Sequence, residues 1–183
     1  QSFTDDPLRM LRALRFVATL GFSLAEDVVN GCIKLKDRLQ IVAKERVKEE
    51  LAKLLTGSYP AQAVALMVAT GLSENIIPEL TQLAKLRDPA HRHKDVLKHT
   101  LKVLEAVPPE LVLRLAALFH DIGKPATITV DADGVHFYHH EVVGAKITRR
   151  RLRELRFPVK IVEEVTKLVE LHMRFHTYRL GWS

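Results

Sequence analysis

Histidine and aspartate residues that could bind a metal ion are concentrated in the second half of the chain. All nine histidines follow residue 90. Five residues lie in or at the end of segments with helical periodicity, in the order His99, His120, Asp121, His140 and His172. Neutral imidazole and ionised carboxylate groups bind hard to borderline divalent metal ions. Because a helix bundle can bring side chains from separate helices to one point, the pattern predicts a divalent metal centre.

The remaining histidines have a simpler interpretation. A single histidine is more often a hydrogen-bonded core or surface residue than a metal ligand. We apply this structural interpretation to His91, His93, His136 and His139. We also prefer this structural interpretation over a ligand role for His176, which lies four residues after His172 and could share its helix face.

The ordered set resembles the HD superfamily of metal-dependent phosphohydrolases. The resemblance covers residues 91–183, and its most specific part is LFHDIGK at residues 118–124, followed by HEVVGA at 140–145. It implies that His99, His120 and Asp121 bind a primary metal. It further implies that His140 and His172 complete a second metal site.

The resemblance also implies a reaction, the hydrolysis of a phosphoester by His120, Asp121 and Lys124, with Lys124 contacting the substrate phosphate. Mg, Mn, Ni, Co and Zn are not distinguished by this ligand set. HD sites normally add a late aspartate, but no Asp or Glu follows Glu170. We therefore expect the natural protein to continue past Ser183 and to supply this ligand; the alternative is a weak metal site.

A second polar set opens the chain. Asp6 and Arg9 lie three residues apart at the start of a predicted helix in which Asp6 is the N-cap, and Arg12 and Arg15 continue a basic stripe. A carboxylate beside a guanidinium offers both acceptors and donors to a nucleobase edge. Taken alone, the pair is more often an N-cap with a surface salt bridge.

The opening segment DDPLRMLRALRF, residues 5–16, resembles the acid-acid-x-x-Arg motif of class II tRNA nucleotidyltransferases, the CCA-adding enzymes and bacterial poly(A) polymerases. The resemblance implies that Asp6 and Arg9 select CTP and ATP and that tRNA is the partner. ERVKEEL at residues 45–51 is similar to the helix that buttresses this motif, and bacterial members place an HD domain next. Residues 139–141 and 172–176 are most similar to actinobacterial members.

The nucleotidyl-transfer head of that family needs a Gly-Ser strand motif and paired aspartates. Asp131 and Asp133 have the paired spacing, but no Gly-Ser element lies just upstream of them, and we reject them as a polymerase site. We expect a fragment that lacks the catalytic head, also because the chain begins with Gln1. The alternative is a non-catalytic tRNA-binding module with a vestigial HD site. Residues 1–60 disfavour a free-standing HD hydrolase.

Basic residues are in excess mainly in the second half. Residues 1–90 contain 12 Lys and Arg against 11 Asp and Glu, whereas residues 91–183 contain 16 against 11, and the net charge is +6. The densest run, residues 146–156, suits the phosphates of a tRNA backbone. We expect RNA contacts from Arg12, Arg15, Lys146, Arg149, Arg150 and Arg153. Charge alone supports a solvated helix face equally well.

Composition and periodicity indicate an all-α protein with one small β-hairpin. The 183 residues are 47% hydrophobic and 27% charged with one cysteine, which excludes disordered, collagen-like and disulfide-based classes. No apolar run is long enough to span a bilayer, and we expect a cytoplasmic protein. Cys32 is expected to be a small buried hydrophobe. We predict a neck and body at residues 1–90, a junction at 87–90 and an HD domain at 91–183.

Helical periodicity and turn signals define the expected elements. A first helix runs from the Asp6-Pro7 cap to Gly21. Further helices are predicted over residues 24–36, 43–55, 60–70, 94–106, 109–120, 141–155 and 159–172. Strands are predicted over residues 127–130 and 135–138, joined by a turn with the sequence DADG.

Overall fold

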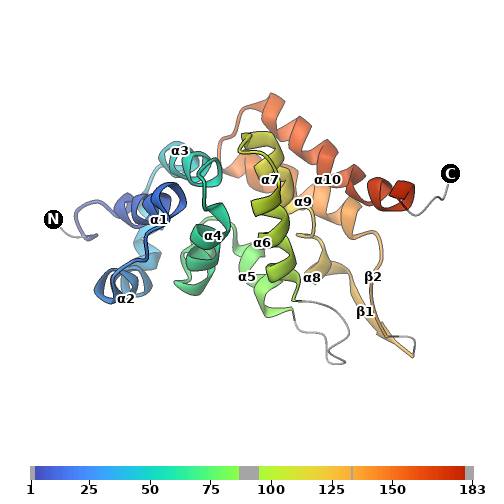
Figure 1. The fold of residues 1–183 in the computed structure, drawn as a ribbon, viewed down its shortest axis with the longest axis horizontal. Helices are drawn as coiled ribbons and strands as arrows, with labels where there is room; N and C mark the ends of the chain where they lie inside the picture. The colour runs from blue at the N-terminus through green and yellow to red at the C-terminus, as the bar shows by residue number, and fades with distance from the viewer. Residues whose placement is uncertain (1–2, 87–94, 133, 180–183) are drawn as a thin grey trace.

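The computed structural model describes residues 3–86, 95–132 and 134–179. The described chain is helical apart from one antiparallel hairpin, as the sequence predicts (Figure 1). The predicted junction at 87–90, His91, His93 and Asp133 lie outside the described residues, as does the side chain of His176. None of the described helices combines the length and the apolar character needed to cross a membrane.

The first half of the molecule is built around α1 (Leu8–Leu20), which packs against α3 (Lys44–Leu55) and α4 (Pro60–Ala69). Apolar residues at three- and four-residue spacing on α1 are fully buried, so the amphipathic pattern explains the packing. The helix ends at Gly21, whose φ of 70° lies in the left-handed region that favours glycine. α2 (Glu26–Leu35) and a 3₁₀ segment (Lys36–Ile41) complete this end of the molecule.

The second half contains the helices that carry the histidines. These are α6 (Val96–Ala106), α7 (Leu111–Phe119), α9 (His140–Glu154) and α10 (Val159–Arg179). α10 packs against both α9 and α7. Between α7 and α9 the chain forms the short helix α8 (Lys124–Thr127) and the hairpin of β1 (Ile128–Asp131) and β2 (Gly134–Phe137), in which Ile128 faces Phe137.

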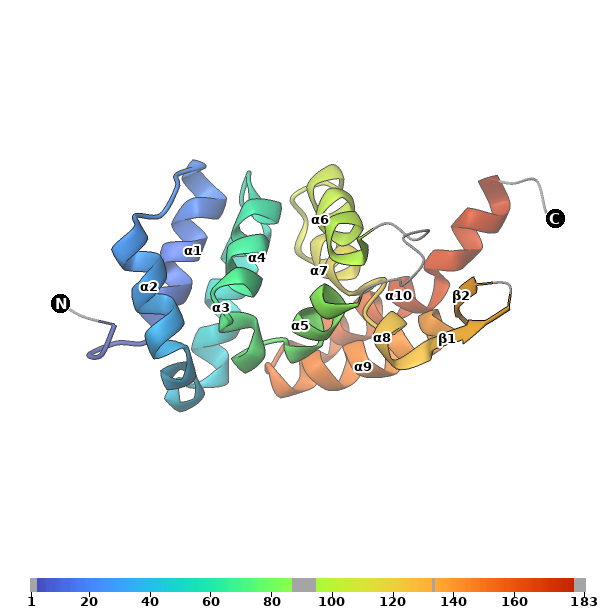
Figure 2. The ribbon, with the colours of Figure 1, turned by 90° about the horizontal axis from the view of Figure 1, so that it is seen from below.

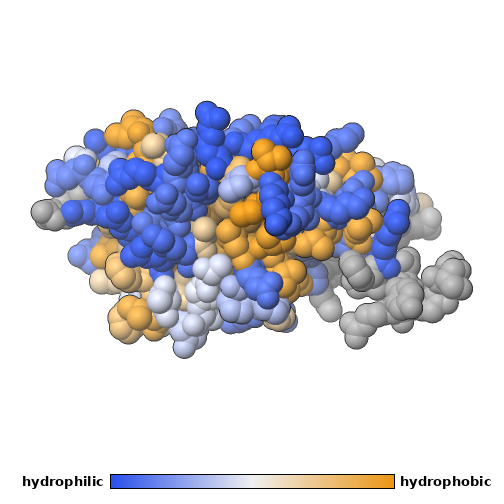
Figure 3. All heavy atoms as spheres, turned by 90° about the horizontal axis from the view of Figure 1, so that it is seen from above, coloured by the Kyte–Doolittle hydropathy of each residue, from blue (hydrophilic) through white to orange (hydrophobic). Residues whose placement is uncertain are grey.

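One hydrophobic core extends through both halves. The 3₁₀ segment Leu72–Asn75 packs against α4 and α5 (Pro78–Lys85), and both α4 and α5 contact the histidine-bearing helix α6 (Figure 2). Buried apolar side chains from α1 to α10 form a single connected cluster. On the outside, hydrophilic residues cover most of the end near the N-terminus in the view of Figure 3, whereas hydrophobic residues reach the surface near its middle.

The predicted elements differ from the structure in a few places. The predicted N-cap is wrong: Pro7 occupies that position, because the chain enters α1 through a tight turn in which the Arg9 amide donates to the Asp6 carbonyl at 3.1 Å. The Asp6 side chain still accepts from the Leu8 amide at 3.3 Å. The last helix continues beyond residue 172, and α5 and α8 were not expected. Each strand is displaced by one residue.

Candidate metal centre

The carboxylate of Asp121 lies at the centre of a cluster of imidazoles. Asp121 follows the end of α7 and its side chain is only 3% exposed. Its Oδ2 atom lies 3.2 Å from Nε2 of His120 and 4.0 Å from Nε2 of His99 on α6. Its Oδ1 atom lies 3.5 Å from Nε2 of His140 on α9 and 3.9 Å from Nε2 of His172 on α10. The structure therefore gathers all five sequence-predicted ligands around one point.

Three of the imidazole rings are oriented in the same way. In His120, His140 and His172, Nδ1 lies 2.8, 2.9 and 2.6 Å from the carbonyl oxygen of the residue three positions earlier in the chain. A carbonyl oxygen can only accept, so each Nδ1 carries the proton and donates it. The neutral ring then presents the lone pair of Nε2, which faces Asp121. This arrangement fixes the tautomer that a metal ligand needs.

The converging Nε2 atoms lie close to Asp121 and to one another. Nε2 of His140 and Nε2 of His172 lie 3.2 Å apart, although both are acceptors in this tautomer. Nε2 of His120 is buried and has no hydrogen-bond partner among the described residues. When the rings are neutral, these buried acceptors face one another and the carboxylate, and a proton or a metal cation between them compensates the loss of their hydration. The donor set therefore fits a divalent metal.

The atoms divide into two groups that share Asp121. One group contains His99, His120 and Asp121, and the other contains Asp121, His140 and His172. Within each group the potential ligand atoms lie within 4.8 Å of one another. This division matches the primary and second sites that the family resemblance implies. In the part of the chain that the structure describes, neither group contains a second carboxylate.

The charge states of the cluster also suit metal binding. Burial by itself raises the pKa of Asp121, but the imidazoles of His120 and His140, once protonated at Nε2, and the ammonium of Lys124 stabilise the carboxylate and hold its pKa far below its ordinary range. Burial lowers the pKa of His172, and neighbouring imidazoles lower it further. An ionised carboxylate and neutral imidazole are the forms that bind metal ions.

Lys124 and Gly123 follow Asp121 and close one side of the centre. Nζ of Lys124 lies 2.8 Å from Oδ2 of Asp121 and 5.5 Å from the centre of the Phe137 ring. Gly123 has an ordinary φ of −80°, so its role is close packing rather than a turn. A Cβ atom there would lie 2.2 Å from the His140 carbonyl oxygen and 2.7 Å from the Gly144 nitrogen.

Two other histidines lie away from the centre, in agreement with the structural interpretation. The ring of His136 stacks on Tyr138 with 5.2 Å between the ring centres, and its Nε2 lies 3.2 Å from Asp131. The side chain of His139 is 83% exposed. Neither belongs to a potential ligand group among the described residues.

The polar residues at the start of α1 are held largely by the segment at residues 45–51, which the family resemblance identifies as the buttress of this motif. Asp6 forms salt bridges with Arg46 at 3.4 Å and with Arg12 at 3.7 Å. The buried carboxylate of Glu50 on α3 binds Arg12 at 3.3 Å and Arg15 at 3.1 Å. Arg46 and Glu50 both lie in this segment of α3, so their contacts agree with the buttressing role that the resemblance implies, although the individual ion pairs were not predicted.

Arg9, Arg12 and Arg15 line a pocket of about 570 Å³ together with Phe16 and Lys53. The guanidinium of Arg15 lies 4.8 Å from the centre of the Phe16 ring, and Phe16 is half exposed. The pocket is therefore basic and has an aromatic wall, features that suit a nucleotide or an RNA phosphate.

The predicted RNA-binding run on α9 divides into two parts. Lys146, Arg149 and Arg153 are exposed to solvent. Arg151 instead binds Glu79 of α5 through two nitrogens at 2.9 and 3.0 Å, and Arg150 reaches the same carboxylate at 3.1 Å. Arg150 is therefore partly used to join α9 to α5, which the sequence alone did not indicate.

Two family descriptions match the chain. "Probable RNA and SrmB- binding site of polymerase A" matches residues 21–83, and "HD domain" matches residues 90–180. The fold and the histidine–aspartate centre thus define a helical RNA-binding region followed by an HD-type domain.

Curated relatives match nearly the whole chain. The chain is 40% identical to the CC-adding tRNA nucleotidyltransferase of Thermus thermophilus, over 94% of this chain and 43% of that protein. It is 37% identical to the A-adding tRNA nucleotidyltransferase of Deinococcus radiodurans, over 92% and 42%. It is 32% identical to the multifunctional CCA protein of Laribacter hongkongensis, over 98% and 45%. The chain belongs to the bacterial tRNA nucleotidyltransferase family and spans somewhat less than half the length of these relatives. The finer resemblance to actinobacterial members stays a prediction.

Proposed function

We propose that this chain is part of a protein that adds CCA, or part of it, to the 3′ ends of tRNA. The two family matches and the names of the relatives support this proposal. Within it, the chain supplies surfaces that bind RNA and nucleotide. The transfer step itself requires a head with a Gly-Ser strand motif followed by paired aspartates, a combination that this sequence does not contain.

At the start of α1 we propose that Asp6 and Arg9 select between CTP and ATP in the complete protein. Arg46 and Arg12 hold the Asp6 carboxylate, so this acceptor is oriented before a base arrives. Arg9 lines the adjacent basic pocket. Orienting donors and acceptors in advance reduces the entropy lost on binding and sharpens discrimination between bases.

We further propose that the HD domain hydrolyses a phosphoester, such as a cyclic phosphate at an RNA end. The observation that carries this proposal is the convergence of three tautomer-fixed imidazoles on one buried, ionised carboxylate. His99, His120 and Asp121 would hold a primary metal, and His140 and His172 would complete a second site with Asp121. A divalent ion bound there activates water and offsets charge on phosphoryl oxygens.

Residues of the chain account for the rest of the chemistry. The Lys124 ammonium, now 2.8 Å from Asp121, can turn to donate to a phosphoryl oxygen and stabilise negative charge that develops there. Carbonyl contacts keep the imidazoles from rotating, so the ligand atoms need no reorganisation when substrate binds.

The alternative is a tRNA-binding module whose HD centre no longer catalyses. One observation favours it: Asp121 is the only carboxylate of the candidate ligand groups in the described part of the chain. A centre with one carboxylate neutralises less of a divalent ion's charge and would bind it more weakly.

The two functions are separated by measuring metal content and hydrolysis of a 2′,3′-cyclic nucleotide in wild type and Asp121→Asn. Asp131→Asn, which changes an exposed acid of the hairpin, is the matched control. The hydrolase proposal predicts that only Asp121→Asn loses both metal and activity. Metal binding without hydrolysis favours the alternative, and equal metal content and equal activity in all three proteins contradict the enzyme.

A further inference from the structure

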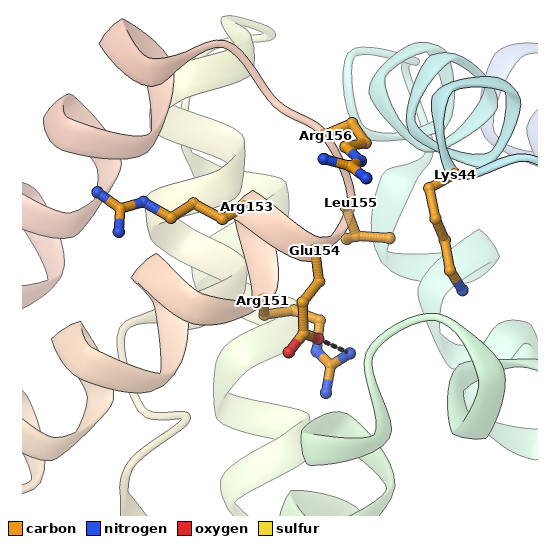
Figure 4. Close-up of a pocket in the computed structure, with 6 residues that line it drawn as sticks. All are labelled: Lys44, Arg151, Arg153, Glu154, Leu155 and Arg156. Atoms are coloured by element: carbon orange, nitrogen blue, oxygen red, sulfur yellow. Dashed lines mark hydrogen bonds and ion pairs between the residues drawn. The ribbon is translucent and has the colours of Figure 1, made fainter.

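A second basic pocket lies where α3 meets the end of α9. It has a volume of about 560 Å³ and is lined by Lys44, Arg151, Arg153, Glu154, Leu155 and Arg156. Arg151 donates to Glu154 at 2.6 Å and also binds Glu79, so its charge is matched within the protein. Figure 4 shows Lys44 and Arg156 extending beside Leu155 from the two elements, whereas the Arg153 guanidinium extends away from Lys44. The pocket therefore has an excess of positive charge, and Lys44 and Arg156 contribute it from two different helical regions.

Arg156 has an unusual backbone conformation for an arginine. Its φ is 63°, in the left-handed region. The amide of Phe157 donates to the Leu152 carbonyl at 3.0 Å, and the amide of Arg156 donates to the Arg153 carbonyl at 2.9 Å. This is the Schellman arrangement, in which glycine is strongly preferred at the position that Arg156 occupies. The backbone at this position favours glycine, so the structure of the helix terminus does not explain why an arginine occupies it.

Neighbouring acidic groups do not fully neutralise the positive charge of this pocket. Arg156 forms an ion pair with Glu45 at 3.9 Å, and both side chains are more than 60% exposed. An exposed pair at this distance is weak and is screened by solvent. Lys44 is the first residue of α3, and within the described residues no side chain caps that N-terminus. Glu45 lies in the same first turn and offsets part of the partial positive charge of the helix end, so the positive charge of the pocket comes mainly from the two side chains.

We propose that this pocket binds backbone phosphates of RNA, with Lys44 and Arg156 as the principal contacts. The inference rests on tRNA being the partner of the chain. Lys44 lies in the matched RNA-binding region and Arg156 in the matched HD domain, so one RNA strand bound here contacts both parts. The pocket shares no lining residue with the pocket on the α1 face or with the candidate metal ligands. It adds Lys44 to the basic run at residues 146–156 that the sequence predicts to contact RNA, and it singles out Arg156 within that run.

The substitution Arg156→Gly tests this directly, because it removes the charge and relieves the backbone at the same time. We expect its melting temperature to equal or exceed that of wild type, while the affinity for a fluorescent tRNA transcript falls several-fold at low salt. The slope of log affinity against log salt, between about 50 and 200 mM, should decrease by about one for each phosphate that the variant no longer neutralises. Lys44→Gln should have a similar effect, and Arg156→Lys should retain most of the affinity.

Lys167→Gln is the matched control, since it removes one exposed charge from α10, where Lys167 pairs with Glu170 at 3.4 Å. Its salt slope should equal that of wild type. If wild type binds the transcript and Arg156→Gly binds it with the same affinity and slope, the pocket is not a phosphate site, although tRNA remains the partner; an acidic protein ligand would give this result. Equal losses in Arg156→Gly and Lys167→Gln also reject the pocket. If wild type does not bind the transcript, both tRNA as the partner and the pocket as a phosphate site are rejected. Hydrolase activity is a separate property, and its loss tests neither claim.

Discussion

The metal centre and the polar face of α1 contain similar kinds of residue but differ in how their charges are matched. At the α1 face, the carboxylates of Asp6 and Glu50 are each bound by arginines. At the metal centre, the nitrogens of His140 and His172 meet as acceptors at 3.2 Å. The carboxylates of the first region are matched by arginines of the chain, whereas the imidazole cluster offers lone pairs that a proton or a metal cation can bind. We therefore expect the first set to position neighbouring side chains and the second set to bind a divalent ion.

The largest expected effect tests how tightly the backbone closes behind the metal centre. Gly123→Ala would place a methyl group 2.2 Å from the His140 carbonyl oxygen, and we expect a loss of about 3 kcal/mol in the free energy of unfolding. Urea denaturation measures it. Gly144→Ala is the control: its nearest contact would be 3.3 Å, and the gain in helix propensity of about 1 kcal/mol offsets it. Similar stabilities for both variants would show that the packing is not restrictive.

The α1 face should lose stability when its buried carboxylate is neutralised. Glu50→Gln leaves Arg12 and Arg15 without their shared counter-charge, and because both arginines are partly exposed we expect a loss of about 1 to 2 kcal/mol. Glu49→Gln, on the exposed side of the same helix, should change stability little. Equal effects in denaturant unfolding would mean that Glu50 does not hold the arginine face in place.

The link between α5 and α9 predicts a dependence of stability on pH. Burial by itself raises the pKa of Glu79, but hydrogen bonds from Arg151 and Arg150 lower it below the ordinary 4.5. Because the folded-state pKa is lowered, the stabilisation is present above about pH 4.5 and is lost as the pH falls below it. Glu79→Gln should therefore flatten the acid side of a plot of stability against pH, and an unchanged acid side would contradict the link. Glu163→Gln, at an exposed position, is the control.

The smallest effect on stability is expected at a metal ligand. His99 is 45% exposed, and His99→Ala should change the free energy of unfolding of the metal-free protein by no more than about 0.5 kcal/mol. It should nevertheless reduce the rise in melting temperature that a divalent ion produces, since binding to the folded state alone stabilises it. A rise as large as in wild type would remove His99 from the ligand set.

Much of this architecture could be predicted because its signals are local. Helix periodicity and the spacing of the histidines identified the helices and the five converging side chains. The short helices α5 and α8 were missed because they offer too few turns for a clear period. The resemblance places Glu50 in the buttressing helix at residues 45–51, but its partners and the role of Glu79 were not predicted. Glu50 binds Arg12, 38 residues away, and Glu79 binds Arg151, 72 residues away, so only the folded chain reveals these pairs.

Gly123 shows that the type of a residue does not always predict its structural role. Gly123 lies two residues after Asp121, and glycine at such a position often serves to allow a turn of the backbone. The structure shows a different cause, since its φ is ordinary and the His140 carbonyl and Gly144 occupy the space of a side chain. Close approach between distant segments is a tertiary property and has no local sequence signal.

The most direct test of the central claim is the ¹⁵N spectrum of the histidine side chains during titration with zinc. Without metal, His120, His140 and His172 should show the tautomer protonated at Nδ1. Addition of zinc should shift the Nε2 signals of these rings and of His99, while those of His136 stay in place. If the Nε2 signals of the four do not move, or if His136 moves equally, the cluster is not a metal centre.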